Sequence, residues 1–102
     1  MATTPEAKVK KRVKEILDKL EAYYFMPATG GYGRSGIPDI IGCFCGVFFA
    51  IECKAGKGKP TALQEREINK IRNGGGQAWL VNEENVEQLY DLLGGLYPPH
   101  PQ

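Results

Sequence analysis

The sequence predicts an α/β fold, a small mixed β-sheet flanked by helices, with the element order α-β-β-β-α-β-α. Short apolar runs separated by turn residues indicate strands, and longer segments with a 3.6-residue apolar period indicate helices around them. The 102 residues, 42% of them hydrophobic and 25% charged, are typical of one globular domain. We assign residues 1–96 to that domain and residues 97–102 to a Pro-rich C-terminal tail.

The first element is an amphipathic helix. Thr4 is a good N-cap and Pro5 suits the first helical position. An apolar stripe follows: Val9, Val13, Ile16, Leu17 and Leu20. Glu6 lies on the same stripe, which places a carboxylate at the end of the inward face. The alternative, which we prefer from the local pattern alone, is that the negative charge of Glu6 only interacts favourably with the positive end of the helix dipole.

Three strands are expected next, over residues 23–28, 40–45 and 47–54. If residues 45–46 form a two-residue hairpin turn, Phe44 faces Val47, and Asp39 lies directly opposite Glu52. Cysteine is a poor residue for a type I′ turn, so a longer turn that shifts the register by one remains an alternative.

Charges at the ends of two buried strands need compensation, because desolvating an unpaired ion costs several kcal/mol. Asp39 opens one apolar run, and Glu52 and Lys54 close the next. Opposed carboxylates repel each other unless a cation lies between them, and divalent cations bind carboxylate oxygens well. The pattern therefore predicts a metal site at this end of the hairpin.

The remaining elements follow in order: a helix opened by the capping box Thr61-Ala62-Leu63-Gln64 and ended by Asn73-Gly74-Gly75-Gly76, a strand over 77–81, and a helix capped by Asn82 that extends through Leu93.

Several classes of protein are disfavoured. No apolar stretch is long enough to span a membrane and the N-terminus has no signal pattern, so we expect an intracellular protein without membrane contact. Three cysteines do not form a secreted disulfide framework, and their spacing does not suit zinc. The G-x-G-x-x-G at residues 31–36 precedes a strand rather than a helix, which rejects a dinucleotide site.

Charge is unevenly distributed. Residues 1–60 hold ten Lys/Arg and six Asp/Glu, whereas residues 61–102 hold three and six. A basic half that contains the unusual carboxylates suits a polyanionic partner. For the helix lysines, an ordinary solvated face is an equally good interpretation. The loop with Tyr32, Arg34 and Ser35 suits a sugar-phosphate backbone, or else is a surface turn.

The combination of Pro38-Asp39 with Glu52-x-Lys54 resembles the signature of the PD-(D/E)XK nucleases, which have a restriction-endonuclease-like fold. More narrowly, the chain resembles a VRR-NUC (virus-type replication–repair nuclease) domain. The similarity runs from Glu6, through Gly36-Ile37-Pro38-Asp39 and the strand ending at Lys54, to Lys59-Pro60-Thr61-x-x-Gln64 and about Val81. Cys53 stands where many relatives carry Val.

The resemblance implies a role for each site residue. Asp39, Glu52 and the backbone carbonyl of Cys53 would hold Mg²⁺ or Mn²⁺. Lys54 would act on the attacking water and on the phosphate charge. Gln64 would position water or phosphate, and Glu6 would complete the site directly or through a water on the metal, which replaces the purely dipolar interpretation. We expect nucleic-acid contacts from these residues: Lys8, Lys11, Arg12, Tyr32, Arg34, Ser35, Lys57 and Lys59.

The favoured function is a metal-dependent DNA endonuclease. Relatives with a lone domain are typically homodimers that cleave branched DNA such as four-way (Holliday) junctions, and many come from phage genomes. The resemblance therefore implies a homodimer that cuts branched DNA in the cytoplasm of a bacterial host. Two alternatives remain open. One is a non-cleaving nucleic-acid-binding or recombination accessory module with the same fold. The weaker one is an enzyme that hydrolyses a small phosphate ester, which open basic loops suit less well than a polymer.

Overall fold

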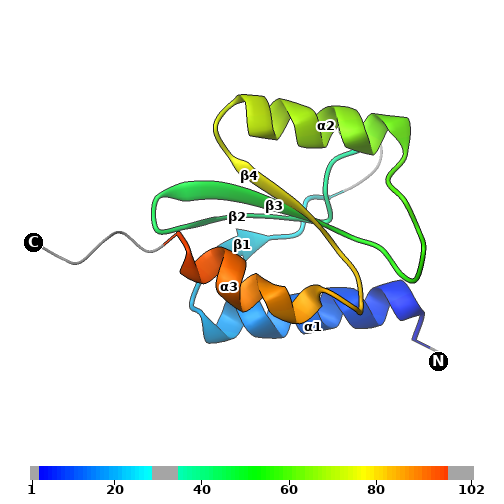
Figure 1. The fold of residues 1–102 in the computed structure, drawn as a ribbon, viewed down its shortest axis with the longest axis horizontal. Coiled ribbons are helices and arrows are strands. Elements are labelled where there is room, and N and C mark those ends of the chain that lie inside the picture. The colour runs from blue at the N-terminus through cyan, green and yellow to red at the C-terminus, as the bar shows by residue number, and fades with distance from the viewer. Residues whose placement is uncertain (1–2, 29–34, 97–102) are drawn as a thin grey trace, which may run out of the picture.

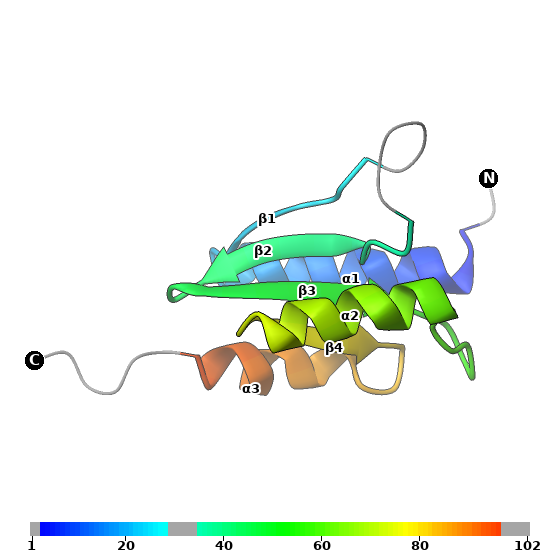
Figure 2. The same cartoon turned by 90° about the horizontal axis from the view of Figure 1, so that it is seen from above.

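The computed structural model describes residues 3–28 and 35–96, and it confirms the α/β class and the element order. The elements are α1 (Pro5–Lys19), β1 (Tyr23–Phe25), β2 (Ile40–Phe44), β3 (Val47–Cys53), α2 (Ala62–Asn73), β4 (Gln77–Val81), a 3₁₀ turn η1 (Val86–Gln88) and α3 (Leu89–Gly94). The four strands form one mixed sheet in the order β1-β2-β3-β4, in which only β3 and β4 are parallel. Helices α1 and α3 cover one face and α2 covers the other (Figures 1 and 2).

The main core lies between the sheet and the α1–α3 layer. Val13, Ile16 and Leu17 of α1 are fully buried there, as the apolar stripe predicts. Alternate residues of β3 face them, ending with Cys53, whose side chain is also fully buried. The strand end that carries the acidic residues is therefore fixed against α1.

A smaller core fixes α2 on the opposite face. Ala50 and Ala78, two small residues on neighbouring strands, let Ile68 of α2 pack close to the sheet. Thr61 caps α2 through the predicted capping box, with both reciprocal hydrogen bonds formed. The start of α2 is thereby set beside the end of β3.

The β2–β3 hairpin has the predicted register. Phe44 pairs with Val47, and Ile40 pairs with Ile51, across a turn in which both central residues have positive φ (53° at Cys45 and 80° at Gly46). Cys45 therefore adopts the left-handed conformation of a type I′ turn, although cysteine is a poor residue for it. The buried faces on both sides of the hairpin outweigh this local cost, because a one-residue slip would reverse every side chain.

Two predicted elements are shorter or less regular than expected. Strand β1 ends at Phe25 rather than at Ala28, because Pro27 has no backbone N–H to donate to a neighbouring strand. Asn82 accepts hydrogen bonds from the backbone N–H groups of Glu84 and Asn85, but this cap opens a turn and η1 before α3 begins at Leu89.

Some expectations fall outside the described residues, namely the tail over 97–102 and the loop residues Tyr32 and Arg34. Among the residues that are described, no helix is long and apolar enough to cross a membrane.

Candidate active site

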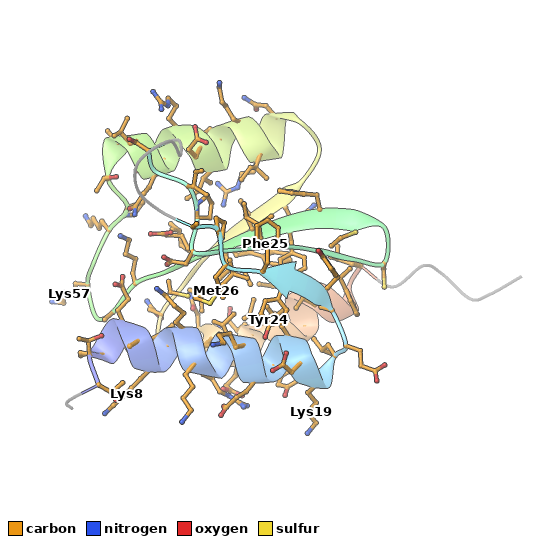
Figure 3. All side chains as sticks on the ribbon, turned by 180° about the vertical axis from the view of Figure 1, so that it is seen from behind. Lys8, Lys19, Tyr24, Phe25, Met26 and Lys57 are labelled. Carbon is orange, nitrogen blue, oxygen red and sulfur yellow. The ribbon has the colours of Figure 1, made fainter. Side chains whose placement is uncertain are left out.

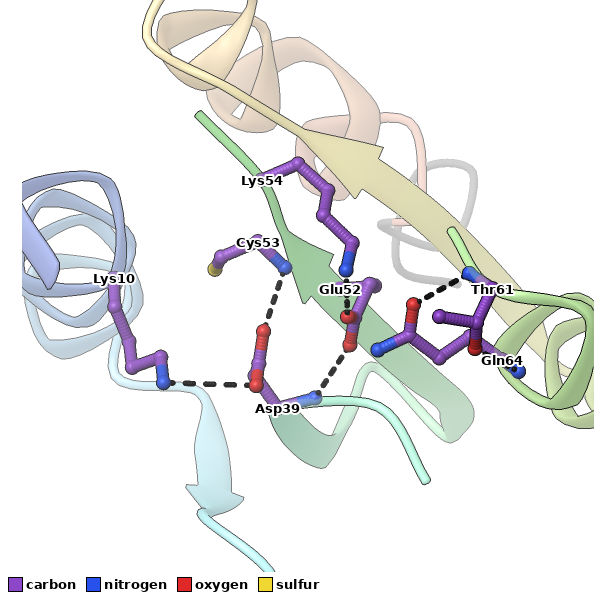
Figure 4. A network of polar contacts seen from close by, with 7 residues as sticks. All are labelled: Lys10, Asp39, Glu52, Cys53, Lys54, Thr61 and Gln64. Carbon is purple, nitrogen blue, oxygen red and sulfur yellow. Dashed lines mark hydrogen bonds and ion pairs between the residues drawn. The ribbon is translucent and has the colours of Figure 1, made fainter. Parts of the chain in front are cut away.

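The two carboxylates meet at the end of the β2–β3 hairpin. Since Ile40 pairs with Ile51, the next residue out on each strand brings Asp39 opposite Glu52, as predicted. Asp39 Oδ2 accepts a hydrogen bond of 2.8 Å from the backbone N–H of Cys53, and Glu52 Oε1 accepts one of 3.2 Å from the N–H of Asp39 (Figure 4). Each carboxylate is thus held by backbone of the opposite strand.

Two lysines neutralise this pair from different elements. Lys54 is the first residue after β3, and its Nζ lies 3.3 Å from Glu52 Oε2. Lys10 Nζ reaches from α1 to within 3.5 Å of Asp39 Oδ1 (Figure 4). Lys10 is the residue that sequence reasoning missed as part of the site. Lys10 lies one helical turn after Glu6 and therefore on the same side of α1, but this spacing does not by itself indicate a contact with Asp39.

Burial and mutual repulsion make the site electrostatically unusual. The Glu52 side chain is 3% exposed. Burial first, and then the Asp39 charge, raise the pKa of Glu52 to about 7, against the opposing effect of Lys54. Burial raises the pKa of the Cys53 thiol to about 12, and the Asp39 carboxylate contributes to the same shift. The thiol is therefore neutral, and Cys53 has only its backbone to offer to the site.

The N-terminus of α2 supplies Gln64. Its Oε1 accepts a 2.9 Å hydrogen bond from the backbone N–H of Thr61. That bond fixes the amide, and Figure 4 shows its nitrogen turned towards Glu52. A donor from a second element thus faces the acidic pair.

Gly36 places the segment before Asp39 directly against this helix end. It has φ +81°, and a Cβ built there would lie 2.4 Å from the carbonyl oxygen of Leu63. Only glycine allows this close approach. The end of the Gly-rich loop therefore sets the position of Pro38-Asp39 relative to Gln64.

Glu6 lies in the first turn of α1, with an exposed side chain. Its charge contributes, less than burial and the Asp39 and Glu52 charges, to the raised pKa of the Cys53 thiol. Among the described residues, no three His, Cys, Asp or Glu side chains gather closely enough to hold a metal ion between them.

Among the described residues predicted to contact nucleic acid, most are exposed and free to meet a partner, whereas Arg12 is held by another side chain. Lys8, Lys11, Lys57 and Lys59 are exposed, as is Ser35. Lys8 and Lys57 lie at one end of the molecule, whereas Lys19 lies at the other end of α1 (Figure 3). Arg12 is instead engaged, because its Nε and Nη2 donate to Glu87 at 2.6 and 2.7 Å.

A groove of about 200 Å³ adjoins the site on the side of β4. It is lined by these residues: Lys54, Gly58, Lys59, Pro60, Leu80, Val81, Asn82 and Asn85. Lys54 and Lys59 give this groove positive charge, so it suits an anionic group next to the acidic pair.

Comparison with known proteins agrees with this geometry. Residues 8–92 match the family model described as the archaeal Holliday junction resolvase (Hjc). A solved structure described as a VRR_NUC domain shares 28% sequence identity and has a TM-score of 0.74, with 87% of this chain and 97% of that chain covered. None of the curated proteins compared with the chain matches it. Both matches are to PD-(D/E)XK-type nuclease families, and they confirm the resemblance that the sequence motifs indicated. The chain belongs to the archaeal Holliday junction resolvase family.

Proposed function

We propose that the chain is a divalent-metal-dependent endonuclease that hydrolyses phosphodiester bonds in branched DNA, four-way junctions above all. The observation that carries the proposal is the acidic pair Asp39–Glu52, held by opposite backbones, with the Lys54 ammonium 3.3 Å from Glu52. Two carboxylates forced together in a largely buried position form a site that a cation stabilises. Membership of a Holliday junction resolvase family supports the choice of substrate.

The donor set fits Mg²⁺ or Mn²⁺. Asp39, Glu52 and the Cys53 carbonyl would offer three oxygens, and Mg²⁺ is usually bound through one or two carboxylates together with waters and substrate phosphates. A three-carboxylate cage is therefore not required. When bound, such a cation lowers the pKa of water and polarises a phosphoryl oxygen.

Three side chains of the protein would orient the water and stabilise the charge on the phosphate. Lys54 lies within ion-pair distance of Glu52, where its ammonium orients the attacking water and stabilises charge on the phosphate. Gln64 presents its amide nitrogen to the same place, since its oxygen is occupied by the Thr61 N–H. Glu6, in the first turn of α1, orients water from the outer side of the site. These roles are part of the proposal.

DNA reaches the site across exposed basic residues. We propose that Lys8 and Lys11 of α1, and Lys57 and Lys59 after β3, contact phosphates on either side of the acidic pair. Ser35, Tyr32 and Arg34 belong to the proposed surface by their place in the sequence. Arg12 contributes less than the others, because Glu87 already holds its guanidinium.

The enzyme acts as a homodimer, since paired strand breaks need two active sites. An apolar patch on the α2 side of the sheet is a suitable interface. Tyr23, Cys43 and Phe48 form one cross-strand row, all exposed, and Phe25 stands beside them. Phe25 lies on β1, an edge strand that α2 does not cover in Figure 2. Such a face is self-complementary when two copies meet about a two-fold axis.

A cleavage panel tests the proposal. Four-way, forked, flap and linear duplex DNAs are incubated with Mg²⁺ or Mn²⁺ and the wild type, Lys54→Ala or Lys70→Ala, the last being an exposed lysine at the far end of α2. We expect the wild type and Lys70→Ala to cut branched DNA, and Lys54→Ala to bind it without cutting. Equal cutting by Lys54→Ala would refute the role of Lys54.

One observation favours the non-cleaving accessory module instead. Each carboxylate has a lysine partner, so the site is neutralised without a metal. Calorimetric titration with Mn²⁺ separates the two functions. Heat of binding that is lost in Asp39→Asn supports the nuclease, whereas junction binding without divalent binding supports the accessory module.

A further inference from the structure

Lys10 differs from the other lysines of α1. Lys8, Lys11, Lys14 and Lys19 are exposed, whereas the Lys10 side chain is 30% exposed and points to Asp39. Its ammonium lies 3.5 Å from Asp39 Oδ1. The proposed reaction leaves Lys10 without a role, although it contacts one of the two acidic residues at the centre of the site.

The two oxygens of Asp39 have different partners. Oδ2 is fixed by the backbone N–H of Cys53 at 2.8 Å, whereas Oδ1 is engaged by Lys10 alone among the contacts described for it. A cation that bound Oδ1 would therefore compete with Lys10. Removing Lys10 leaves the carboxylate oriented, because its Oδ2 hydrogen bond does not depend on the lysine.

The charges at the site favour release of one lysine when a divalent cation binds. When both carboxyl groups are ionised, Asp39 and Glu52 carry two negative charges, and Lys10 and Lys54 carry two positive charges. A divalent cation added to this group would bring four positive charges against two negative charges, and release of one ammonium would halve that excess. Lys10 is the more exposed of the two, at 30% against 18% for Lys54, and its ion pair is the longer one.

We propose that Lys10 exchanges partners: it holds Asp39 in the metal-free protein, and when a divalent cation takes Asp39 it is released to a DNA phosphate. The proposal rests on the proposed metal-dependent nuclease and adds a residue to it. Before a metal ion binds, the Lys10 ammonium reduces the repulsion between the Asp39–Glu52 pair and DNA. After the metal ion binds, the same ammonium adds a phosphate contact next to the site. Lys10 is a positioning residue in the first state and a DNA-binding residue in the second.

The first test is metal affinity without DNA. Mn²⁺ is titrated calorimetrically into the wild type, Lys10→Met, Lys10→Arg and Lys19→Met. Methionine keeps the length and helix propensity of lysine, and Lys19 is a matched control at the far end of α1 (Figure 3). We expect Lys10→Met to bind Mn²⁺ about two- to fivefold more tightly, as loss of a partly exposed competing ion pair predicts. Lys10→Arg and Lys19→Met should stay near the wild type.

The second test is the salt dependence of binding to a four-way junction, followed by fluorescence anisotropy with Ca²⁺ as the oxygen-binding cation and again with chelator. With Ca²⁺, Lys10→Met should lower the slope of log K against log salt by about 0.9, the value of one phosphate contact. With chelator, the two slopes should agree, because Lys10 is then paired with Asp39.

The outcomes separate this inference from the proposed function. If the wild type binds Mn²⁺ and Lys10→Met has the same affinity and the same slopes, the exchange is overturned while the nuclease stands. If the wild type binds no divalent cation, the metal-dependent nuclease fails, and the exchange fails with it.

Discussion

The backbone N–H of Asp39 donates to the side chain of Glu52 over 3.2 Å, while the Asp39 side chain accepts from the residue after Glu52. The two carboxylates are therefore cross-linked by main-chain donors that belong to the hairpin itself. Main-chain donors cannot rotate away, so the pair stays close despite its repulsion. This rigidity is what a metal centre needs before the metal arrives.

Replacement of Asp39 by Asn tests the acidic pair. The Asn side-chain oxygen still accepts from the Cys53 N–H, but one negative charge is lost. We expect cleavage to fall by more than about 100-fold, because several kcal/mol of cation-dependent stabilisation is removed. Stability in urea should change by less than about 1 kcal/mol, since the lost Lys10 pair is partly exposed and the repulsion with Glu52 is relieved. Unfolding of this variant would show that Asp39 serves structure instead.

Stability should depend on pH through Glu52. Its folded-state pKa is raised to about 7 from 4.5, so the folded protein binds more protons than the unfolded chain between these values. The metal-free protein therefore loses stability as the pH rises from about 4.5 to 7, by at most about 3 kcal/mol. Urea unfolding with chelator, at pH 5 and pH 8, measures the effect.

Glu52→Gln is the control for this pH dependence, because other groups titrate over the same range. The loss of stability between pH 5 and pH 8 should be smaller in Glu52→Gln than in the wild type. Addition of Mn²⁺ at pH 8 should restore stability to the wild type alone. Identical pH dependence in both proteins would mean that Glu52 is charged without cost, against the burial of its side chain.

The register of the hairpin could be predicted because it follows from counting. A two-residue turn fixes Phe44 opposite Val47, and the alternation of buried residues fixes everything behind it. The opposition of Asp39 and Glu52 is then a matter of arithmetic. Gln64 could be placed at the start of a helix from its capping box, a local pattern of four residues.

Lys10 could not be predicted in the same way. Its contact with Asp39 depends on the angle at which α1 packs on the sheet, and no local pattern in the sequence determines that angle. The interrupted start of the last helix has a similar origin. Asn82 caps two backbone donors of a turn, and the packing of Val86 and Leu89 into the core then decides where regular helix begins.

The proposed dimer interface predicts a change of oligomeric state. Phe48→Glu places a charge within the apolar patch, where a second copy would have to desolvate it. We expect the dissociation constant of the dimer to rise by at least about tenfold, as measured by light scattering over a concentration series. Leu92→Glu is the matched control, because Leu92 is a similarly exposed apolar residue on α3, and this variant should stay dimeric. A wild type that is monomeric throughout, or equal dissociation in both variants, contradicts this interface.

Gly36 links the loop to the active site, and its replacement by Ala separates positioning from folding. Gly36 and Gly46 both have positive φ, at +81° and +80°, but a Cβ at Gly46 would meet nothing within 4 Å, whereas at Gly36 it would meet Leu63 backbone at 2.4 Å. Gly46→Ala should cost about 1 kcal/mol of stability from its backbone conformation alone. Gly36→Ala should cost at least about twice as much, because the segment before Asp39 must also move away from α2.

That movement changes the distance from Asp39 to Gln64, so cleavage should fall in Gly36→Ala at temperatures where both variants remain folded. Cleavage assays beside thermal unfolding of the two variants measure this, and equal activity in both would show that the contact of Gly36 with α2 does not position the site.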